Sequence, residues 1–149
     1  MRKLPAIALL LSLGACGAQI DEQIEERYAT WFEAQSAGAI ERGWVPYFVP
    51  ETARDIRDSH NLDTNAQRLQ FTVPPSNVSA MVSGLRRASA DDKTAAAELA
   101  REFRFGGASD AYVVCSDIRN GALIVDRESG QTAYDTTVRW ADDDCSQAK

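Results

Sequence analysis

The sequence has little of what enzymes most often use for catalysis. It contains one histidine, His60, and three cysteines in 149 residues. It has no Gly-x-Ser-x-Gly elbow, no P-loop and no dinucleotide-binding fingerprint. A side-chain nucleophile needs a positioned base, and His60 is the only imidazole that could supply one. The sequence therefore argues against nucleophilic and nucleotide-dependent catalysis, and no cofactor or metal is expected.

Basic residues and long apolar runs are also scarce. Sixteen Lys and Arg face 22 Asp and Glu, and the formal net charge is −6. A surface this acidic repels nucleic acid and anionic headgroups, so no nucleic-acid partner is expected. The longest apolar run, Ile7 to Leu13, is too short to cross about 30 Å of hydrocarbon.

The first fifteen residues have the layout of a secretory signal peptide. Arg2 and Lys3 precede the apolar run, and Leu13-Gly14-Ala15 leads directly into Cys16. A Cys after Leu-Gly-Ala resembles the lipobox of bacterial lipoproteins. The resemblance implies cleavage before Cys16 and lipidation of its sulfur and of the new amino terminus, which anchors a protein firmly. The alternative is an ordinary cleaved signal peptide followed by a chance Cys.

This resemblance predicts the location and the domain organisation. Gly17 stands where the lipoprotein sorting rule places Asp for retention in the inner membrane, so the outer membrane, facing the periplasm, is expected. Residues 16–19 form a short lipidated tether, and residues 20–149 form one domain. Loss of Arg2 and Lys3 with the signal changes the net charge to −8, so the lipid itself is the expected contact with the membrane.

The other two cysteines, Cys115 and Cys145, are an even pair in an oxidising compartment. A disulfide between them would stabilise the fold by about 3–4 kcal/mol in the loop-entropy model. The alternative, free or metal-binding thiols, lacks nearby His or Cys ligands. The sequence favours the disulfide.

Hydrophobic periodicity predicts the first elements. Apolar residues at Ile20, Ile24, Tyr28 and Trp31 predict an amphipathic helix from Ile20 to about Arg42. Strict alternation over residues 68–73 predicts a half-buried strand. Two further helices are predicted, one after Pro74 and Pro75 and one from Ser89 to Phe103.

The last forty residues read as a β-meander. Asn120-Gly121 and Ser129-Gly130 are hairpin signals. Two-residue turns at both places bring the apolar residues to one side of the sheet, which a one-residue slip would undo. These residues are Tyr112, Val114, Ile118, Leu123, Val125, Tyr134, Val138 and Trp140. The predicted fold class is α+β, with an antiparallel sheet of about four strands and helices packed on one side.

Residues 42–65 contain the strongest candidates for a chemical site: Asp55, Asp58, His60 and Asp63. If Pro50 opens a helix running to about Asp58, His60 lies about 140° from Asp55 and about 160° from Asp58 around the helix axis. The carboxylates and the imidazole then do not converge, which disfavours a metal or acid–base site.

A structural interpretation accounts for the same segment better. Gly43 ends a helix, Pro46 forces extended backbone before it, and Trp44 contributes buried area. Pro50 sets the first turn of a helix. Asp63-Thr64-Asn65 offers side-chain oxygens for an Asx-type turn that leads into the strand.

Three motifs in this segment carry a family resemblance. They are Gly-Trp-Val-Pro from Gly43, Pro-x-x-Ala-x-Asp-Ile from Pro50 and His-Asn-Leu-Asp-Thr-Asn from His60. Behind a lipobox, they resemble a family of small bacterial lipoproteins with a YbbD head domain, over about Trp31 to Phe71. The resemblance implies a location and a fold but no reaction.

These observations favour a non-enzymatic, lipid-anchored protein of the cell envelope with a structural or interaction role. Its expected partners are the membrane, through the lipid, and another envelope protein. One alternative is a periplasmic module that binds or inhibits an envelope-targeting enzyme such as lysozyme. Another is a hydrolase or metalloprotein that uses His60.

Overall fold

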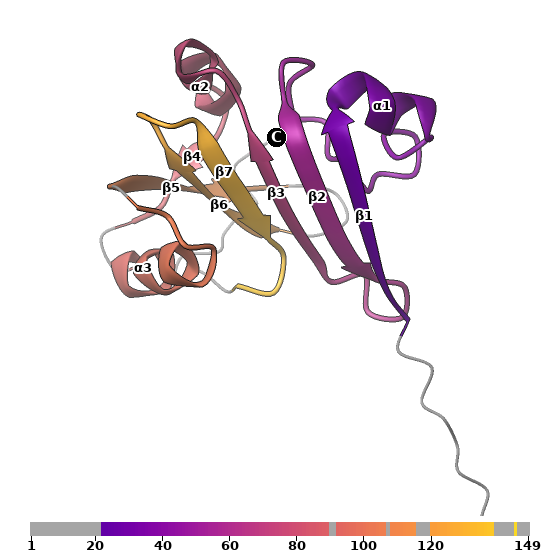
Figure 1. The fold of residues 1–149 in the computed structure, drawn as a ribbon. Coiled ribbons are helices and arrows are strands. Elements are labelled where there is room, and N and C mark those ends of the chain that lie inside the picture. Colours follow the sequence, from indigo (N-terminus) through magenta and orange to yellow (C-terminus); the bar gives the residue numbers. More distant parts are fainter. Residues whose placement is uncertain (1–21, 90–91, 107, 116–119, 139–144, 146–149) are drawn as a thin grey trace, which may run out of the picture.

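The structure is a computed structural model that describes residues 22–89, 92–106, 108–115, 120–138 and 145. Within these residues it contains one seven-stranded antiparallel sheet and three helices (Figure 1). The strands are β1 (Gln23–Thr30), β2 (Arg54–Asn61), β3 (Gln67–Thr72), β4 (Arg86–Arg87), β5 (Ser109–Val114), β6 (Gly121–Asp126) and β7 (Gln131–Asp135). The helices are α1 (Trp31–Ser36), α2 (Pro75–Val82) and α3 (Lys93–Glu102).

The sheet has the strand order β1-β2-β3-β7-β6-β5-β4. The N-terminal strands and the C-terminal meander therefore meet where β3 pairs with β7. The α+β class is confirmed, but the prediction of about four strands is wrong. The additional strands come from segments predicted to be helical, together with the short β4.

β1 replaces most of the helix that was predicted from Ile20 to about Arg42. Ile24 and Tyr28 are four residues apart, a spacing that suits one face of a helix and one face of a strand equally well. The burial of β1 alternates with a period of two, with Tyr28 on the buried face and Arg27 exposed. The helix begins only at Trp31, where the Thr30 side chain accepts a hydrogen bond from the Glu33 amide.

β2 replaces the helix predicted after Pro50. The chain turns at Pro50, whose carbonyl accepts a hydrogen bond from the Ala53 amide, and then pairs with β1 and with β3. Pairing on both sides satisfies the backbone along this strand and overrides the helix signal of a single proline. The helices predicted after Pro75 and before Phe103 are confirmed as α2 and α3.

The core lies on both faces of the sheet. α2 contributes Val78 and Val82 to a cluster with Leu123, while α3 contributes Leu99 to a second cluster with Ile124. Since Leu123 and Ile124 are adjacent in β6, their side chains point to opposite faces. The prediction that the helices pack on one side is therefore wrong.

The meander places five of its eight apolar residues on one face as predicted, the prediction for Val138 is wrong, and the register differs. Tyr112, Val114, Leu123, Val125 and Tyr134 share one cluster. Val138 packs against the other cluster, and Ile118 and Trp140 lie outside the described residues. Leu123 pairs with Tyr134 and with Tyr112, so the strands are displaced from the predicted pairing by even numbers of residues, which keeps each side chain on its face.

Both predicted two-residue turns are wrong, for reasons visible at their glycines. Gly121 belongs to β6, where a Cβ atom would collide with the Tyr134 ring. Gly130 closes a longer turn in which its amide donates to the Asp126 carbonyl, and its φ of +73° favours glycine.

Cys115 and Cys145 are joined by a disulfide, with their Cα atoms 5.6 Å apart. Both cysteines pack against the cluster that α3 covers. Among the residues that the structure describes, no helix is long and apolar enough to cross a bilayer.

Candidate functional site

β2 brings Asp58 and His60 together. Residues two apart in a strand share a face, and both side chains point into the core side, where Asp58 is 2 % and His60 5 % exposed. His60 Nδ1 lies 2.5 Å from Asp58 Oδ2. The prediction that these groups do not converge is wrong because it assumed a helix.

Asp55 and Asp63 do not join them. Asp55 lies at an irregularity of β2 with a φ of +52°, and its side chain is exposed. Asp63 lies in the turn between β2 and β3, where its hydrogen bond and its negative charge raise the pKa of Glu22. The described part of the chain contains no group of three or more His, Cys, Asp or Glu side chains that could hold a metal ion.

Gln67 links the Asp58–His60 pair to the loop after α1. Its side-chain amide donates to Asp58 Oδ1 at 2.7 Å and also to the backbone carbonyl of Trp44. The Trp44 ring in turn lies over His60, with ring centroids 4.1 Å apart. The four residues form a closed circuit that fixes the Trp44 loop to the sheet.

Burial dominates the electrostatics of this circuit. Desolvation raises the pKa of Asp58, although the hydrogen bonds from Gln67 and His60 act in the opposite direction. His60 Nε2 is buried and has no hydrogen-bond partner in the described part of the chain. On the far side of the indole, the Arg42 guanidinium lies 3.9 Å from the ring centroid, as in a cation–π contact.

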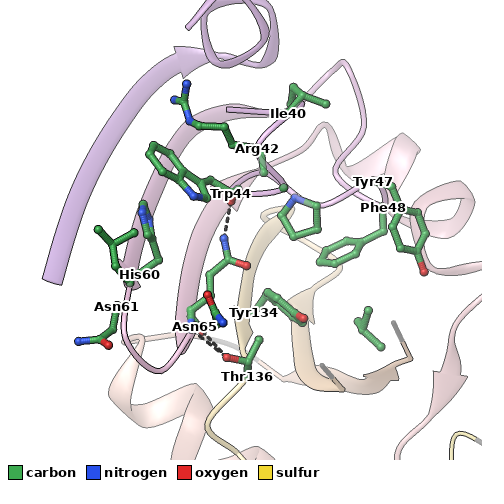
Figure 2. Close-up of a pocket in the computed structure, with 16 residues that line it drawn as sticks. Ile40, Arg42, Trp44, Tyr47, Phe48, His60, Asn61, Asn65, Tyr134 and Thr136 are labelled. Atoms are coloured by element: carbon green, nitrogen blue, oxygen red, sulfur yellow. Dashed lines mark hydrogen bonds between the residues drawn. The ribbon is translucent and has the colours of Figure 1, made fainter. Parts of the chain in front are cut away.

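Beside this circuit lies a cavity of about 540 Å³ (Figure 2). Its walls come from the loop after α1, from the β2–β3 hairpin and from the meander. The lining residues are Ile40, Arg42, Gly43, Trp44, Val45, Pro46, Tyr47, Phe48, His60, Asn61, Leu62, Asn65, Gln67, Val114, Tyr134 and Thr136. Most of these side chains are apolar or aromatic, and none is a carboxylate.

The cavity wall contains one possible base, His60, but few possible nucleophiles. The hydroxyl groups among the lining residues belong to Tyr47, Tyr134 and Thr136. The Thr136 hydroxyl accepts a hydrogen bond from the backbone amide of Gln67 and donates one to the backbone carbonyl of Gln67. Burial raises the pKa of Tyr134 to about 12, so its phenol stays protonated. Among the residues that the structure describes, no Ser or Cys lines the cavity.

The predicted structural residues shape the same region. Gly43 has a φ of +76° and lies in the loop before Trp44; the prediction that it ends a helix is wrong, because α1 ends at Ser36. The Pro46 carbonyl accepts a hydrogen bond from the Val49 amide. In the β2–β3 turn, the Asn61 side chain accepts hydrogen bonds from the Thr64 amide and hydroxyl, and Asn65 has a φ of +53°. The Asx-type contact therefore starts at Asn61, two residues before the predicted Asp63.

Gln67 and the cavity were not predicted from the sequence. A signal for Gln67 was present, because it continues the alternation of Leu69, Phe71 and Val73 and must face the core. A buried amide needs polar partners, which would have directed attention to Asp58. The cavity could not be found in this way, since Val114, Tyr134 and Thr136 reach it only through the pairing of β3 with β7.

Comparison with known families identifies part of the chain. Residues 22–72 match the family model of the YbbD head domain, which confirms the resemblance found in the sequence. The match contains β1, α1, β2 and β3, and therefore the complete circuit of Trp44, Asp58, His60 and Gln67. The meander lies outside it. Searches of the curated proteins and of the solved structures find no match to this chain.

Proposed function

We propose that this chain is a lipid-anchored protein of the bacterial envelope that recognises another envelope component and catalyses no reaction. The observation that carries the proposal is the cavity, an apolar, aromatic recess with a few fixed polar groups, which is the usual composition of a binding site. Its volume, about 540 Å³, is in the range typical for such sites.

The contacts of His60 support recognition over chemistry. Its Nδ1 is held by Asp58, its ring is covered by Trp44, and both neighbours are tied to Gln67. These contacts brace one wall of the cavity. A general base has to reach the group from which it takes a proton, whereas His60 Nε2, the ring nitrogen that Asp58 does not hold, is buried.

Exposed apolar side chains border the cavity. Tyr47 is 75 % and Leu62 49 % exposed, and both belong to the lining. Exposed aromatic residues beside an apolar recess are typical of interaction sites. The partner is therefore expected to contact this face.

Anchoring is supported by the lipobox-like Leu13-Gly14-Ala15-Cys16 and by the short connection from Cys16 to β1. Gly17 supports the outer membrane as the location. Metabolic labelling with a fatty-acid analogue tests this part. The label should mark the wild-type chain and not Cys16→Ala; equal labelling of both chains would refute the anchor.

Photo-crosslinking in intact cells tests recognition. A benzophenone amino acid at Tyr47 should capture a reproducible envelope component at native expression. The same amino acid at Glu98, exposed on α3, is the control and should not capture it. Failure to capture anything from Tyr47, or the same product from both positions, would refute recognition through the cavity face.

One observation favours a second candidate, a hydrolase that uses His60. The Asp58 carboxylate orients the imidazole as the acid of a catalytic triad does. The candidate needs a nucleophile that the lining does not offer as Ser or Cys, and replacement of His60 separates the two functions.

A further inference from the structure

We propose that the cavity binds one acyl chain of a phospholipid from the bilayer to which the protein is anchored. This inference rests on the proposed function, because it requires the lipid anchor at Cys16. It adds the chemical class of the ligand and the source from which the ligand comes.

The lining suits an acyl chain. Trp44, Phe48 and Tyr134 provide aromatic walls, and Val114 and Leu62 add aliphatic ones. An acyl chain needs apolar surface and no hydrogen-bond partners, and each methylene that leaves water gains about 0.8 kcal/mol.

A positive charge in the cavity lining suits the phosphate of a phospholipid headgroup. The chain has a net charge of −6, yet among the residues that the structure describes no Asp or Glu lines the cavity. Arg42 is the one Arg or Lys among the described lining residues, and its side chain is exposed. A phosphate at the mouth could pair with this guanidinium, whose planar donors match phosphate oxygens.

The position of the cavity points to the bilayer as the source. Leu62 lies on the β2–β3 hairpin, and its amide donates to the carbonyl of Glu22 at 3.3 Å. Figure 1 shows this hairpin beside the start of β1. Glu22 follows Cys16 by six positions, a length that spans at most about 20 Å when fully extended. An anchored Cys16 therefore keeps the Leu62 side of the cavity near the lipid surface.

Bilayer phospholipid is also the more plausible supply in energetic terms. An acyl chain in water costs about 0.8 kcal/mol for each exposed methylene, so very little free lipid is present in solution. A chain that passes directly from the bilayer into an adjoining apolar cavity avoids most of this cost.

Quenching of tryptophan fluorescence by brominated phospholipids tests the inference. The full-length lipidated protein is reconstituted into phosphatidylcholine vesicles whose acyl chains carry bromine near their ends. Such bromines contact Trp44 only if the acyl chain leaves the bilayer and enters the cavity. The emission of Trp44 is obtained by comparison with Trp44→Phe, because Trp31 and Trp140 also emit.

A matched pair of rim substitutions makes the test specific. Leu62→Asp places a charge on the cavity rim, whereas Phe32→Asp changes a residue that is 57 % exposed and does not line the cavity. We expect brominated vesicles to cause a loss of Trp44 emission in the wild type and in Phe32→Asp, and little loss in Leu62→Asp. Equal loss in all three proteins would overturn the inference.

Flotation of the vesicles separates this inference from the proposed function. If the protein does not float with the vesicles, the anchor is refuted. If the protein floats but its Trp44 emission is not reduced, acyl binding is refuted and the anchor stands. Quenching by a brominated free fatty acid in solution, without quenching by brominated vesicles, would overturn the bilayer as the source.

Discussion

Strands β1–β3 and strands β5–β7 belong to one sheet, but they are buried differently. All six residues of β6 are buried, because one helix packs on each face. β1 alternates between exposed and partly buried residues, and β2 and β3 likewise bury mainly one face. The polar circuit of Asp58, His60 and Gln67 lies in the half with one buried face.

This difference suggests that the two halves of the sheet have different roles, one supporting the cavity and one contacting the partner. The meander is an apolar platform, clasped by the disulfide between Cys115 and Cys145, and it supplies Tyr134 and Thr136 to one wall of the cavity. The strands that match the YbbD head domain, with their loops, supply the Arg, His, Asn and Gln side chains and the exposed residues of the cavity lining. Recognition would then depend on side chains of the first half that are held in place by the second.

The largest decrease in the free energy of unfolding is expected when a core leucine is removed from either half of the sheet. Leu69 in β3 and Leu123 in β6 are both fully buried and both pair with Tyr134. Replacement of either by Ala should lower the free energy of unfolding by about 2–5 kcal/mol. The loss should be larger for Leu123, since packing on both faces of β6 limits how far the site can collapse.

Urea denaturation of the two variants measures this difference. The exposed Phe32→Ala serves as the control and should change the midpoint little. An equal or larger loss for Leu69→Ala would contradict the comparison between the halves.

Removal of the disulfide should have the next largest effect. Cys115→Ala combined with Cys145→Ala should lower the free energy of unfolding by about 2–4 kcal/mol. Since the bond lies on the α3 side, the fluorescence of Trp44 in the folded state should stay unchanged. A shifted Trp44 spectrum, or unaltered stability, would contradict the account in which the disulfide stabilises the meander and leaves the Trp44 loop unaffected.

The smallest changes in the free energy of unfolding are expected from changes of pH. They should have opposite signs in the two halves of the sheet. In the meander, the hydrogen bond from Arg127 lowers the pKa of Asp110, with a further contribution from Arg87. The stabilisation by Asp110 is therefore complete above its ordinary pKa of 3.8 and is lost as the pH falls through the lowered value. In the first half, Asp63 raises the pKa of Glu22, so stability declines as the pH rises from 4.5 through the raised value.

Urea midpoints across the acidic range, measured for the wild type, Asp110→Asn and Glu22→Gln, check these signs. Asp110→Asn should reduce the acid-induced loss, and Glu22→Gln should reduce the decline above pH 4.5, of which the raised pKa of the buried Asp58 leaves a part. An unchanged profile in either variant would contradict the corresponding assignment.

Sequence periodicity predicted the meander better than the first half, for a physical reason. In the meander, two turns were wrong, yet Leu123, Val125 and Tyr134 kept their faces because the displacement was an even number of residues. In the first half, the step of four between Ile24 and Tyr28 fits helix and strand equally well. The long-range pairing of β1 with β2 decided between them, and a local pattern does not contain that information.

The sequence pointed to part of the candidate site but not to its geometry. Asp58 and His60 were named from the sequence, and the wrong helix placed them on different sides. Asp55 and Asp63 were named with them because carboxylates close in sequence are candidates for one site. The bulge of β2 and the hairpin turn place these two elsewhere.

The most direct measurement of the central claim, recognition without catalysis, is the replacement His60→Gln, with the exposed Asp63→Asn as control. Melting, bound metal and the crosslink from Tyr47 are followed together. The account predicts that His60→Gln weakens the buried circuit by about 1–3 kcal/mol, leaves the metal content unchanged and retains the crosslink while the protein is folded. Unchanged melting together with loss of a bound metal or of a hydrolytic activity would contradict it.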